Sequence, residues 1–372
     1  MAEGDIGDTV VDSIDFEEST MSIMCDICHV TGDIYAITYI NNDGYIKTIS
    51  ISANGNIGSV IDTLAFSLDT TANYPRLIHV SGDVFAVVYE DANEGRVETF
   101  TISAAGTIGS VIDTSTFANG VIFASDPAIL HISGDVYAIA YPTYVFPHPL
   151  SGFVVTLAIA ADGTIGAVID RLQFEHAYCT YLDFIHVSGN YYAISYSGPG
   201  NHGWLVTVEI DSSGNIGDAV VDSLEFDTTY ANFTQILNVY GDYYAIIYSN
   251  TDNDGAVCTV TINNLGQITV IDTGEWESDR GINMVSFLHI SGNVYAVPYT
   301  GTDDHGWLKT FSISRTGVVG AVIDSLEYDS TYSHRPKMVH VGGSIYAIIY
   351  QHSTTTGRLV TLQIETIPVK DR

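Results

Sequence analysis

Basic residues are scarce in this sequence. Only 12 lysines and arginines stand against 44 aspartates and glutamates, which gives a formal net charge of −32 over 372 residues. Proteins that bind nucleic acid neutralise its phosphates with lysine and arginine, so we expect no nucleic-acid partner and no contact with anionic membrane surfaces. The same charge favours solubility and is compatible with divalent cations or basic partners.

Long apolar segments are also missing. The sequence contains no run of about 18 apolar residues, so we expect no membrane insertion. The first residues, Met1 to Gly4, have none of the features of a secretory signal. Because lysine is rare while tyrosine, threonine and serine are abundant, we expect an extracellular or cell-surface protein whose leader has been removed; a cytoplasmic location stays open.

Cysteine occurs four times, in positions that do not form a disulfide framework. Cys25 and Cys28 precede His29 in a Cys-x-x-Cys-His pattern, which is typical of covalent haem attachment. The histidine recurs elsewhere in the chain without neighbouring cysteines, however. We therefore interpret the two cysteines as coincidental, with Cys28 as a core residue, and expect no haem or other organic cofactor.

Catalytic motifs are missing as well. The sequence has no nucleophile elbow, no His-Glu-x-x-His segment and no cysteine beside a candidate base. Acidic residues are so numerous that nothing selects two of them as a glycosidase pair. The sequence thus favours a binding protein over an enzyme, and a carbohydrate-active enzyme stays an alternative.

A repeat is what the sequence does contain. The phrase Ile/Val-Tyr-Ala-Ile-x-Tyr occurs, with small variations, seven times, and its alanines are 50, 52, 55, 52, 51 and 51 residues apart. They are Ala36, Ala86, Ala138, Ala193, Ala245, Ala296 and Ala347. A period of this length indicates stacked supersecondary units.

One repeat reads as four short strands joined by hairpins. In the second unit, residues 77–80, 84–89, 96–103 and 108–117 are rich in β-branched and aromatic residues, and Ser-Gly-Asp and Ala-Ala-Gly-Thr turns separate them. The second strand is apolar on both faces, so it must be covered on both sides. A ring of sheets does this, because each blade lies between two neighbours.

We therefore predict an all-β fold: a seven-bladed β-propeller of four-stranded antiparallel blades. The chain, 1–372, is expected to form a single domain. Its repeats are expected near 26–75, 76–127, 128–182, 183–234, 235–285, 286–336 and 337–372, with 1–17 completing the last.

The two ends of the chain predict how the ring closes. The last repeat lacks a fourth strand, while residues 4–12 match residues 214–222, which lead into a fourth strand. The N-terminal strand should therefore complete the last blade, which leaves no unpaired blade edge at the junction. This closure resembles that of WD40-type propellers in architecture only, because the Trp-Asp signature is absent.

A histidine recurs in the first strand of six repeats, and Asn238 replaces it in the fifth. A ring of imidazoles around the central channel could bind a metal or an anion. We favour a structural role, in which each side chain bridges a buried polar network to the repeated third-strand threonine or fourth-strand aspartate. The histidines are His29, His79, His131, His186, His289 and His340.

Binding residues are expected where the repeats differ, in two sets of loops. These are the loops between the second and third strands and the loops between blades, and strand direction puts both on one face of the ring. Blades four and six carry nearly the same phrase there, with a tryptophan beside a histidine and polar residues. Such a platform suits a sugar ring; the alternative is that each tryptophan only covers the end of its own blade. The candidate ligand-binding residues are Trp204, Trp307, His202, His305, Asp303, Asp304, Tyr230 and Tyr332, with Tyr178 and Tyr181 nearby.

Two further loops are candidate sites. Residues 250–255 place Asp252 and Asp254 at alternate positions before a glycine, which suits Ca²⁺, although the distal glutamate of an EF-hand is missing and such residues are also common in turns. The loop of residues 142–149 carries Tyr144, Phe146 and His148, whose apolar rings suit a partner protein.

Together these features predict a non-catalytic binding or adhesion module that recognises a glycan or protein surface through its loops. The first alternative is a structural subunit of an extracellular assembly such as a surface layer, filament or virion, which would require self-assembly. The second is a carbohydrate-active lyase or hydrolase.

Overall fold

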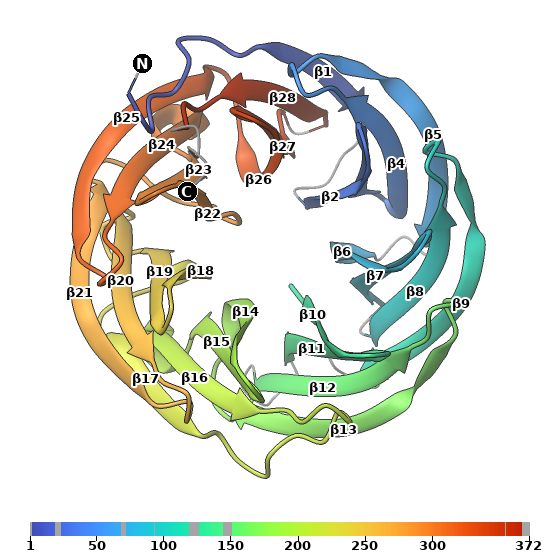
Figure 1. Ribbon diagram of the computed structural model, residues 1–372, viewed down its shortest axis with the longest axis vertical. Coiled ribbons are helices and arrows are strands. Elements are labelled where there is room, and N and C mark those ends of the chain that lie inside the picture. The colour runs from blue at the N-terminus through green and yellow to red at the C-terminus, as the bar shows by residue number, and fades with distance from the viewer. Residues whose placement is uncertain are drawn as a thin grey trace, which may run out of the picture.

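The computed structural model describes residues 2–18, 24–67, 72–92, 94–118, 126–143, 151–353 and 355–366. Seven four-stranded antiparallel sheets surround a central axis (Figure 1), and each sheet is one blade. The predicted all-β, seven-bladed propeller is confirmed. The described part of the chain contains no helix that is long and apolar enough to cross a membrane.

Every blade has the same strand order, from the axis outward. The innermost strands are β2 (Cys25–Thr31), β6 (Asn73–Ser81), β10 (Ala128–Ser133), β14 (Thr180–Ser188), β18 (Asn232–Tyr240), β22 (Leu288–Ser291) and β26 (His334–Gly342). The second strands are β3 (Ile34–Asn41), β7 (Val84–Asp91), β11 (Val136–Thr143), β15 (Tyr191–Ser197), β19 (Tyr243–Ser249), β23 (Val294–Thr300) and β27 (Ile345–Gln351).

The third and fourth strands form the outer half of each blade. The third are β4 (Asp43–Ile51), β8 (Glu94–Ile102), β12 (Ser151–Ile159), β16 (Gly203–Glu209), β20 (Gly255–Ile262), β24 (Gly306–Ile313) and β28 (Gly357–Gln363). The outermost are β5 (Ile57–Ser67), β9 (Ile108–Ala118), β13 (Ile165–Glu175), β17 (Asp222–Asp227), β21 (Ile268–Glu277), β25 (Val319–Asp329) and, in the last blade, β1 (Asp12–Glu17).

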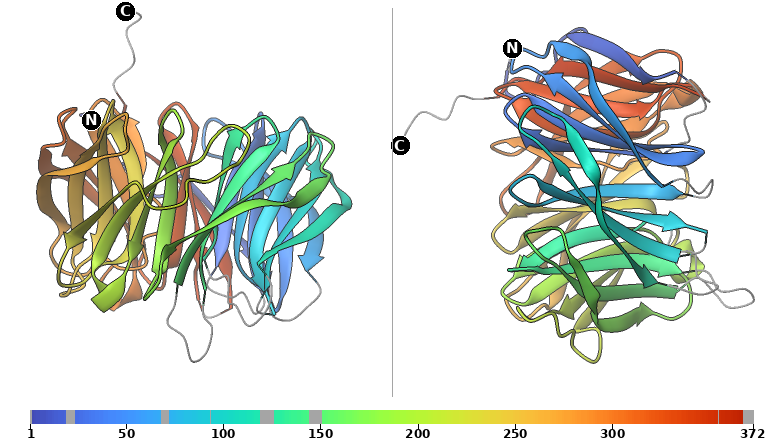
Figure 2. Two further views of the ribbon diagram at one scale, coloured as in Figure 1. Left: turned by 90° about the horizontal axis from the view of Figure 1, so that it is seen from below. Right: turned by 90° about the vertical axis from the view of Figure 1, so that its right-hand side faces the viewer.

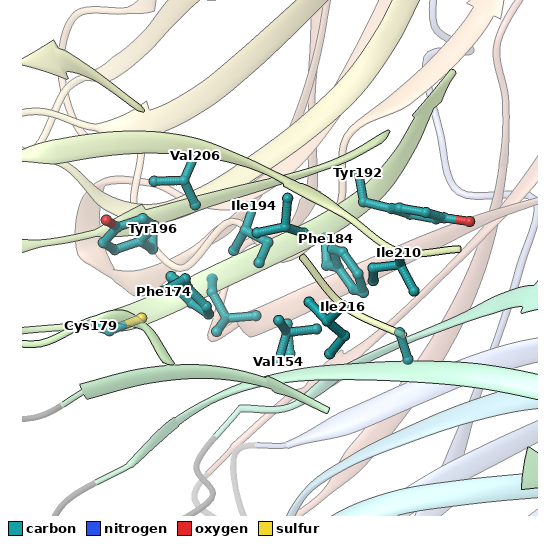
Figure 3. Packing of buried hydrophobic residues seen from close by; sticks show 14 residues of the cluster. Val154, Phe174, Cys179, Phe184, Tyr192, Ile194, Tyr196, Val206, Ile210 and Ile216 are labelled. Atoms are coloured by element: carbon teal, nitrogen blue, oxygen red, sulfur yellow. The ribbon is translucent and has the colours of Figure 1, made fainter. Parts of the chain in front are cut away.

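The hydrophobic core lies between blades. All residues of β7 are buried, as the apolar residues on both of its faces require, whereas β5 has exposed and half-buried positions up to its buried end at Phe66 and Ser67. Between blades three and four, Val154 of β12 belongs to one cluster with Phe184, Ile194 and Val206 of the next blade (Figure 3). Each blade therefore buries its apolar faces only because its neighbours are present.

Repeated polar side chains join each blade to the next. A third-strand threonine donates its hydroxyl to a glycine carbonyl at 2.5 to 2.7 Å, in the pairs Thr48–Gly106, Thr99–Gly163, Thr156–Gly214, Thr207–Gly266, Thr259–Gly317, Thr310–Gly4 and Thr361–Gly55. A fourth-strand aspartate accepts a backbone N–H at 2.7 to 3.0 Å, in the pairs Asp12–Ile57, Asp62–Ile108, Asp113–Ile165, Asp170–Ile216, Asp222–Ile268, Asp272–Val319 and Asp324–Ile6. Much of the acidity that recurs with the repeat is therefore structural.

The ring closes as predicted. Strand β1 pairs with β28 from Asp12, opposite Thr361, onward, and Ile6 forms a further bridge with Ile364. The same N-terminal segment supplies Gly4 and Ile6 to the threonine and aspartate contacts of the preceding blade. One segment thus completes the last sheet and links two blades.

The repeated histidines are structural, but their predicted partners are wrong. Each side chain is exposed, and its Nε2 bonds a glycine carbonyl of the turn that follows, at 2.7 to 3.0 Å, rather than a threonine or aspartate. Asn238 makes the equivalent bond to Gly241 at 2.8 Å. The difference arises because the first strand ends at this point, so the side chain reaches the turn rather than the blade interior.

The four cysteines are free, as expected. Cys28 is half-buried and packs against the cluster between the first two blades, and burial raises the pKa of its thiol to about 12.

The propeller has two faces that carry different loops. The inter-blade loops and the loops between second and third strands lie on one, here called the loop face, and the N-terminal residues lie on the other (Figure 2).

Candidate functional site

The loops of blades four and six have the same structure on the loop face. In blade six, β23 leads into the single-turn helix η2 (Thr302–Asp304) and then β24; in blade four, η1 (Pro199–Asn201) occupies the same place between β15 and β16. Asn201 and Asp304, which directly precede the two histidines, adopt left-handed φ angles of 61° and 63°. The repeated phrase therefore specifies a repeated loop conformation.

The histidine of each loop pairs with a carboxylate of its own blade. His202 Nδ1 lies 2.5 Å from Glu225 Oε1, and His305 Nδ1 lies 2.5 Å from Glu327 Oε1. These glutamates lie on the outermost strands, opposite the tryptophans in register. The pairs hold the loops against the blade edge, and the glutamates were not among the residues selected from sequence.

Both tryptophans cover part of their own blade. Trp204 and Trp307 are half-buried and pack against neighbouring core clusters. The rings also lie directly on loop glycines, because a Cβ added at Gly198 or Gly301 would stand 2.3 or 2.4 Å from the indole Cδ1. Trp204 Nε1 is buried and has no hydrogen-bond partner among the described residues. Close glycine contact thus fixes the orientation of each ring.

The ring of Trp307 lines a pocket. A pocket of about 200 Å³ opens between blades five and six, with Trp307 as its aromatic wall. Its lining residues are Glu277, Asp279, Arg280, Tyr299, Gly301, Thr302, Trp307, Lys309 and Ser325. Of these, sequence reasoning selected Trp307 alone.

The charges of this pocket are largely paired. Lys309 Nζ lies 2.7 Å from Glu277 Oε2, and the Tyr299 hydroxyl donates to the same carboxylate. Burial, followed by that hydrogen bond, raises the pKa of Tyr299 well above its ordinary value. Blade one repeats this arrangement with Tyr39, Glu17 and Lys47, so the floor of the pocket is a feature of the fold.

The rim of the pocket is specific to blade six. Thr302 Oγ1 donates to Asp279 Oδ2 at 2.8 Å, and Arg280 pairs with Asp304 at 2.9 Å while both side chains remain partly exposed. These groups present a hydroxyl, a carboxylate and a guanidinium next to Trp307. His305 and Asp303 do not line the pocket.

The two predicted tyrosines occupy inter-blade loops outside this pocket. Tyr230 donates its backbone N–H to Asp227 at 3.1 Å, and its hydroxyl accepts from Asn232. Tyr332 stacks on His334 with ring centroids 6.1 Å apart. The structure thus spreads the selected aromatic residues along the loop face and does not gather them at one point.

The predicted calcium and partner loops have different outcomes. In the former, Asn250 Oδ1 accepts the backbone N–H groups of Asp252 and Asp254 at 2.9 and 3.0 Å, as in an ordinary polar turn. Within the described ranges, no three His, Cys, Asp or Glu side chains gather to hold a metal ion, and Ca²⁺ binding stays a prediction. Tyr144, Phe146 and His148 lie outside the described residues.

A second group of residues meets at the axis on the loop face. Tyr74, Asp126, Tyr181, Phe233 and Arg335 each lie five residues before the repeated histidine or its replacement, Asn238. All five have left-handed φ angles, between 45° and 55°. Such angles are rare for bulky residues and strain the backbone, and strained residues cluster at functional sites.

Contacts between distant blades hold this axial cluster together. The Arg335 guanidinium of blade seven lies 5.3 Å from the ring centroid of Tyr74, 5.9 Å from that of Tyr181 and 5.8 Å from that of Phe233. Asp126 Oδ1 bonds Arg76 at 2.7 Å, and its Oδ2 lies 3.9 Å from Arg335. Blades two, three, four, five and seven therefore converge at the mouth of the central channel.

Sequence reasoning named only Tyr181 from this cluster. A signal was available, because this position varies among tyrosine, aspartate, phenylalanine and arginine within an otherwise repeated strand. Its importance depends on the left-handed backbone, which neither periodicity nor composition reveals.

His334 lies beside this cluster and should make stability depend on pH. Burial, followed by the charge of Arg335, lowers its pKa from 6.5 to about 4. Between these values the unfolded chain binds a proton that the folded protein does not, so the free energy of unfolding falls as pH falls. Between pH 7 and pH 4.5 this effect amounts to roughly 2–3 kcal/mol. Denaturant titrations at pH 7 and pH 4.5 measure the free energy of unfolding at each pH. From the higher to the lower pH, this free energy should fall by roughly 2–3 kcal/mol less in His334→Asn than in the unmodified protein.

The matched control for this prediction is His186→Asn. It also removes one imidazole, and it reproduces the asparagine that blade five carries naturally at position 238. An equal effect of both substitutions on the pH dependence would contradict the assignment to His334.

The fold and site define an acidic seven-bladed β-propeller with a rim pocket and an axial cluster on one face. No protein-family model and no curated protein matches the sequence.

Solved structures provide the remaining comparisons. A Bacteroides fragilis protein provisionally assigned as a 6-phosphogluconolactonase is similar at a TM-score of 0.57 and 14% identity, over 90% of this chain and 91% of its own. A Bacteroides uniformis protein with the same provisional assignment gives 0.55 and 12%, over 81% and 82%. A protein of unknown function from Dyadobacter fermentans gives 0.52 and 9%, over 79% and 95%. At these identities the similarity concerns the fold alone.

Proposed function

We propose that this protein is a non-catalytic binding module that recognises a glycan through the loop face. The observation that carries the proposal is the Trp307 pocket. A sugar ring offers an apolar C–H face and a polar edge, and the pocket offers an indole face beside the hydroxyl, carboxylate and guanidinium of Thr302, Asp279 and Arg280.

The size of the pocket supports a ligand segment of one ring. Its volume of about 200 Å³ is below the range of roughly 300–1,000 Å³ that is common for drug-sized ligands. The equivalent position between blades four and five is a wider space of about 410 Å³, where Ala256 replaces the tryptophan. Both pockets are lined by the repeated tyrosine, Tyr299 or Tyr248, and the blade-six pocket adds the indole ring of Trp307.

A glycan array followed by calorimetry on the selected glycans tests the proposal. Trp307→Ala should weaken binding by about 30-fold or more, because buried tryptophan anchors are commonly worth about 2 kcal/mol or more. Trp204→Ala is the matched control: it removes the same side chain from the related loop, and Trp204 does not line the pocket. Thermal unfolding of both variants checks that they remain folded.

Other results would replace the proposal with one of its alternatives. A blank array together with concentration-dependent assembly in sedimentation would favour a structural subunit, and a blank array with capture of a purified protein would favour a protein ligand. Depolymerisation of a polysaccharide would identify an enzyme. Glycan binding that Trp307→Ala leaves unchanged would contradict the assignment to this pocket.

A further inference from the structure

We infer that the axial cluster on the loop face is a second binding site, in which the Arg335 guanidinium takes the carboxylate group of a small ligand. This site is separate from the Trp307 pocket and does not depend on the glycan proposal. Its ligand class is an organic acid with an apolar or ring-shaped body next to the carboxylate.

The hydrogen-bonding state of Arg335 is the first observation. Its side chain is only 10% exposed, yet it donates no hydrogen bond to another described residue, and its nearest carboxylate oxygen is 3.9 Å away. A guanidinium has five N–H donors, and buried polar groups nearly always have partners. The Arg335 guanidinium therefore keeps N–H donors that no described protein group accepts.

The aromatic rings position the guanidinium without using those donors. Tyr74, Tyr181 and Phe233 surround Arg335 at 5.3 to 5.9 Å, and the rings of Tyr181 and Phe233 lie 4.4 Å apart. A guanidinium held by aromatic faces keeps its in-plane N–H groups for a planar, bidentate partner such as a carboxylate. The rings also offer an apolar surface to the body of the ligand.

Among the described residues, Asp126 is the ion-pair partner of Arg335, and it is shared with a second guanidinium. Asp126 is shared between two guanidiniums, at 2.7 Å from Arg76 and 3.9 Å from Arg335. The neighbouring Lys337 pairs with Asp26 at 3.3 Å. Asp183, the other carboxylate nearby, accepts the backbone N–H groups of Phe184 and Ile236. A ligand carboxylate would therefore be held by the N–H groups of Arg335 that Asp126 does not reach, rather than by an excess of positive charge.

The backbone supplies an independent indication. The first strands of four blades have a register irregularity next to the left-handed residue, between Asn73 and Arg76 in β6 and at the equivalent places in β14, β18 and β26. The same strained backbone conformation therefore recurs around the axis, while the side chain at this position differs from blade to blade. A small cavity of about 10 Å³, the size of one water, lies among Arg335, Arg76, Asp126 and Tyr74.

Calorimetry on the full-length protein tests this site with three probes: D-glucuronate, acetate and inorganic phosphate. We expect carboxylate binding to the unmodified protein. Arg335→Lys should weaken it by about 10- to 100-fold, because lysine keeps the charge but loses a bidentate contact worth about 1.5–3 kcal/mol. Arg335→Gln should abolish it. Arg358→Gln is the matched control, since Arg358 also lies on the loop face but is bound by Asp15.

The outcomes separate this inference from the glycan proposal. Trp307→Ala should leave carboxylate binding unchanged whether or not the glycan proposal holds. Glucuronate binding tighter than acetate would support a ligand with a ring beside its carboxylate. Absence of carboxylate binding, preference for phosphate, or equal affinity of Arg335→Lys and the unmodified protein would each overturn the inference. If Arg335→Gln does not fold, Arg335→Lys still decides, because it preserves the charge among the aromatic rings.

Discussion

Deletion of residues 2–17 should abolish cooperative folding. The deletion removes strand β1 and exposes the edge of β28, and it removes the buried side chains of Ile6 and Phe16. Full burial of such side chains is worth about 1.5–3 kcal/mol each, a large fraction of a typical stability of about 5–15 kcal/mol. The exposed strand edge would also promote association. Circular dichroism melting and size-exclusion chromatography should show a non-cooperative or aggregated chain.

A circular permutant is the control for this deletion. It joins the original ends and opens the chain within residues 19–23, so that the sequence of β1 follows β28. The connection is feasible because Gly4 and Glu365 are already linked by a backbone hydrogen bond of 2.9 Å. We expect the permutant to melt cooperatively. A truncated protein that melted at the same temperature as the complete one would show that closure contributes little.

Asp126→Asn should destabilise the protein by about 3–5 kcal/mol, as expected when one partner of a buried ion pair is removed. The substitution leaves the Arg76 and Arg335 guanidiniums without their shared carboxylate, in a place where Asp126 is only 10% exposed. Asparagine also tolerates the left-handed φ of 45° at this position, so the effect reports on charge rather than on the backbone. Urea or guanidinium unfolding at pH 7 measures it.

Asp15→Asn provides the comparison at an exposed site. Asp15 pairs with Arg358 at 2.6 Å, but both side chains are about 30% exposed, at 32% and 28%. Surface pairs of this kind are worth about 0–1 kcal/mol. Similar losses for the two substitutions would mean that the axial charges are better solvated than their burial indicates.

The architecture was predictable because it depends on features that repeat. Seven copies of one apolar phrase require seven sheets that cover one another, and the match between residues 4–12 and 214–222 identifies the closing segment. The loop face followed from strand direction. The histidine partners were predicted incorrectly, because a pattern of residue types does not reveal that the side chain turns back to Gly32 and its equivalents.

The sites were predictable only where residue type alone was informative. Trp307 attracted attention because a tryptophan beside polar residues is unusual, whereas Arg280 and Thr302 are ordinary loop residues until the fold brings them next to it. Tyr74, Asp126 and Arg335 come from blades two, three and seven. Their proximity is set by the radius of the ring and by a local left-handed turn, so no spacing along the chain indicates it.

The amino-acid sequence by itself determined the number of blades, their strands, the closure and the acidic character. These follow from short-range patterns copied seven times, and each copy must satisfy the same packing and hydrogen-bonding requirements. Only the tertiary structure decided which side chains share a pocket and which of them keep hydrogen-bond donors that no described protein group accepts. Those properties arise from contacts between blades, where residues far apart in the chain meet, and the unused donors of Arg335 become apparent only there.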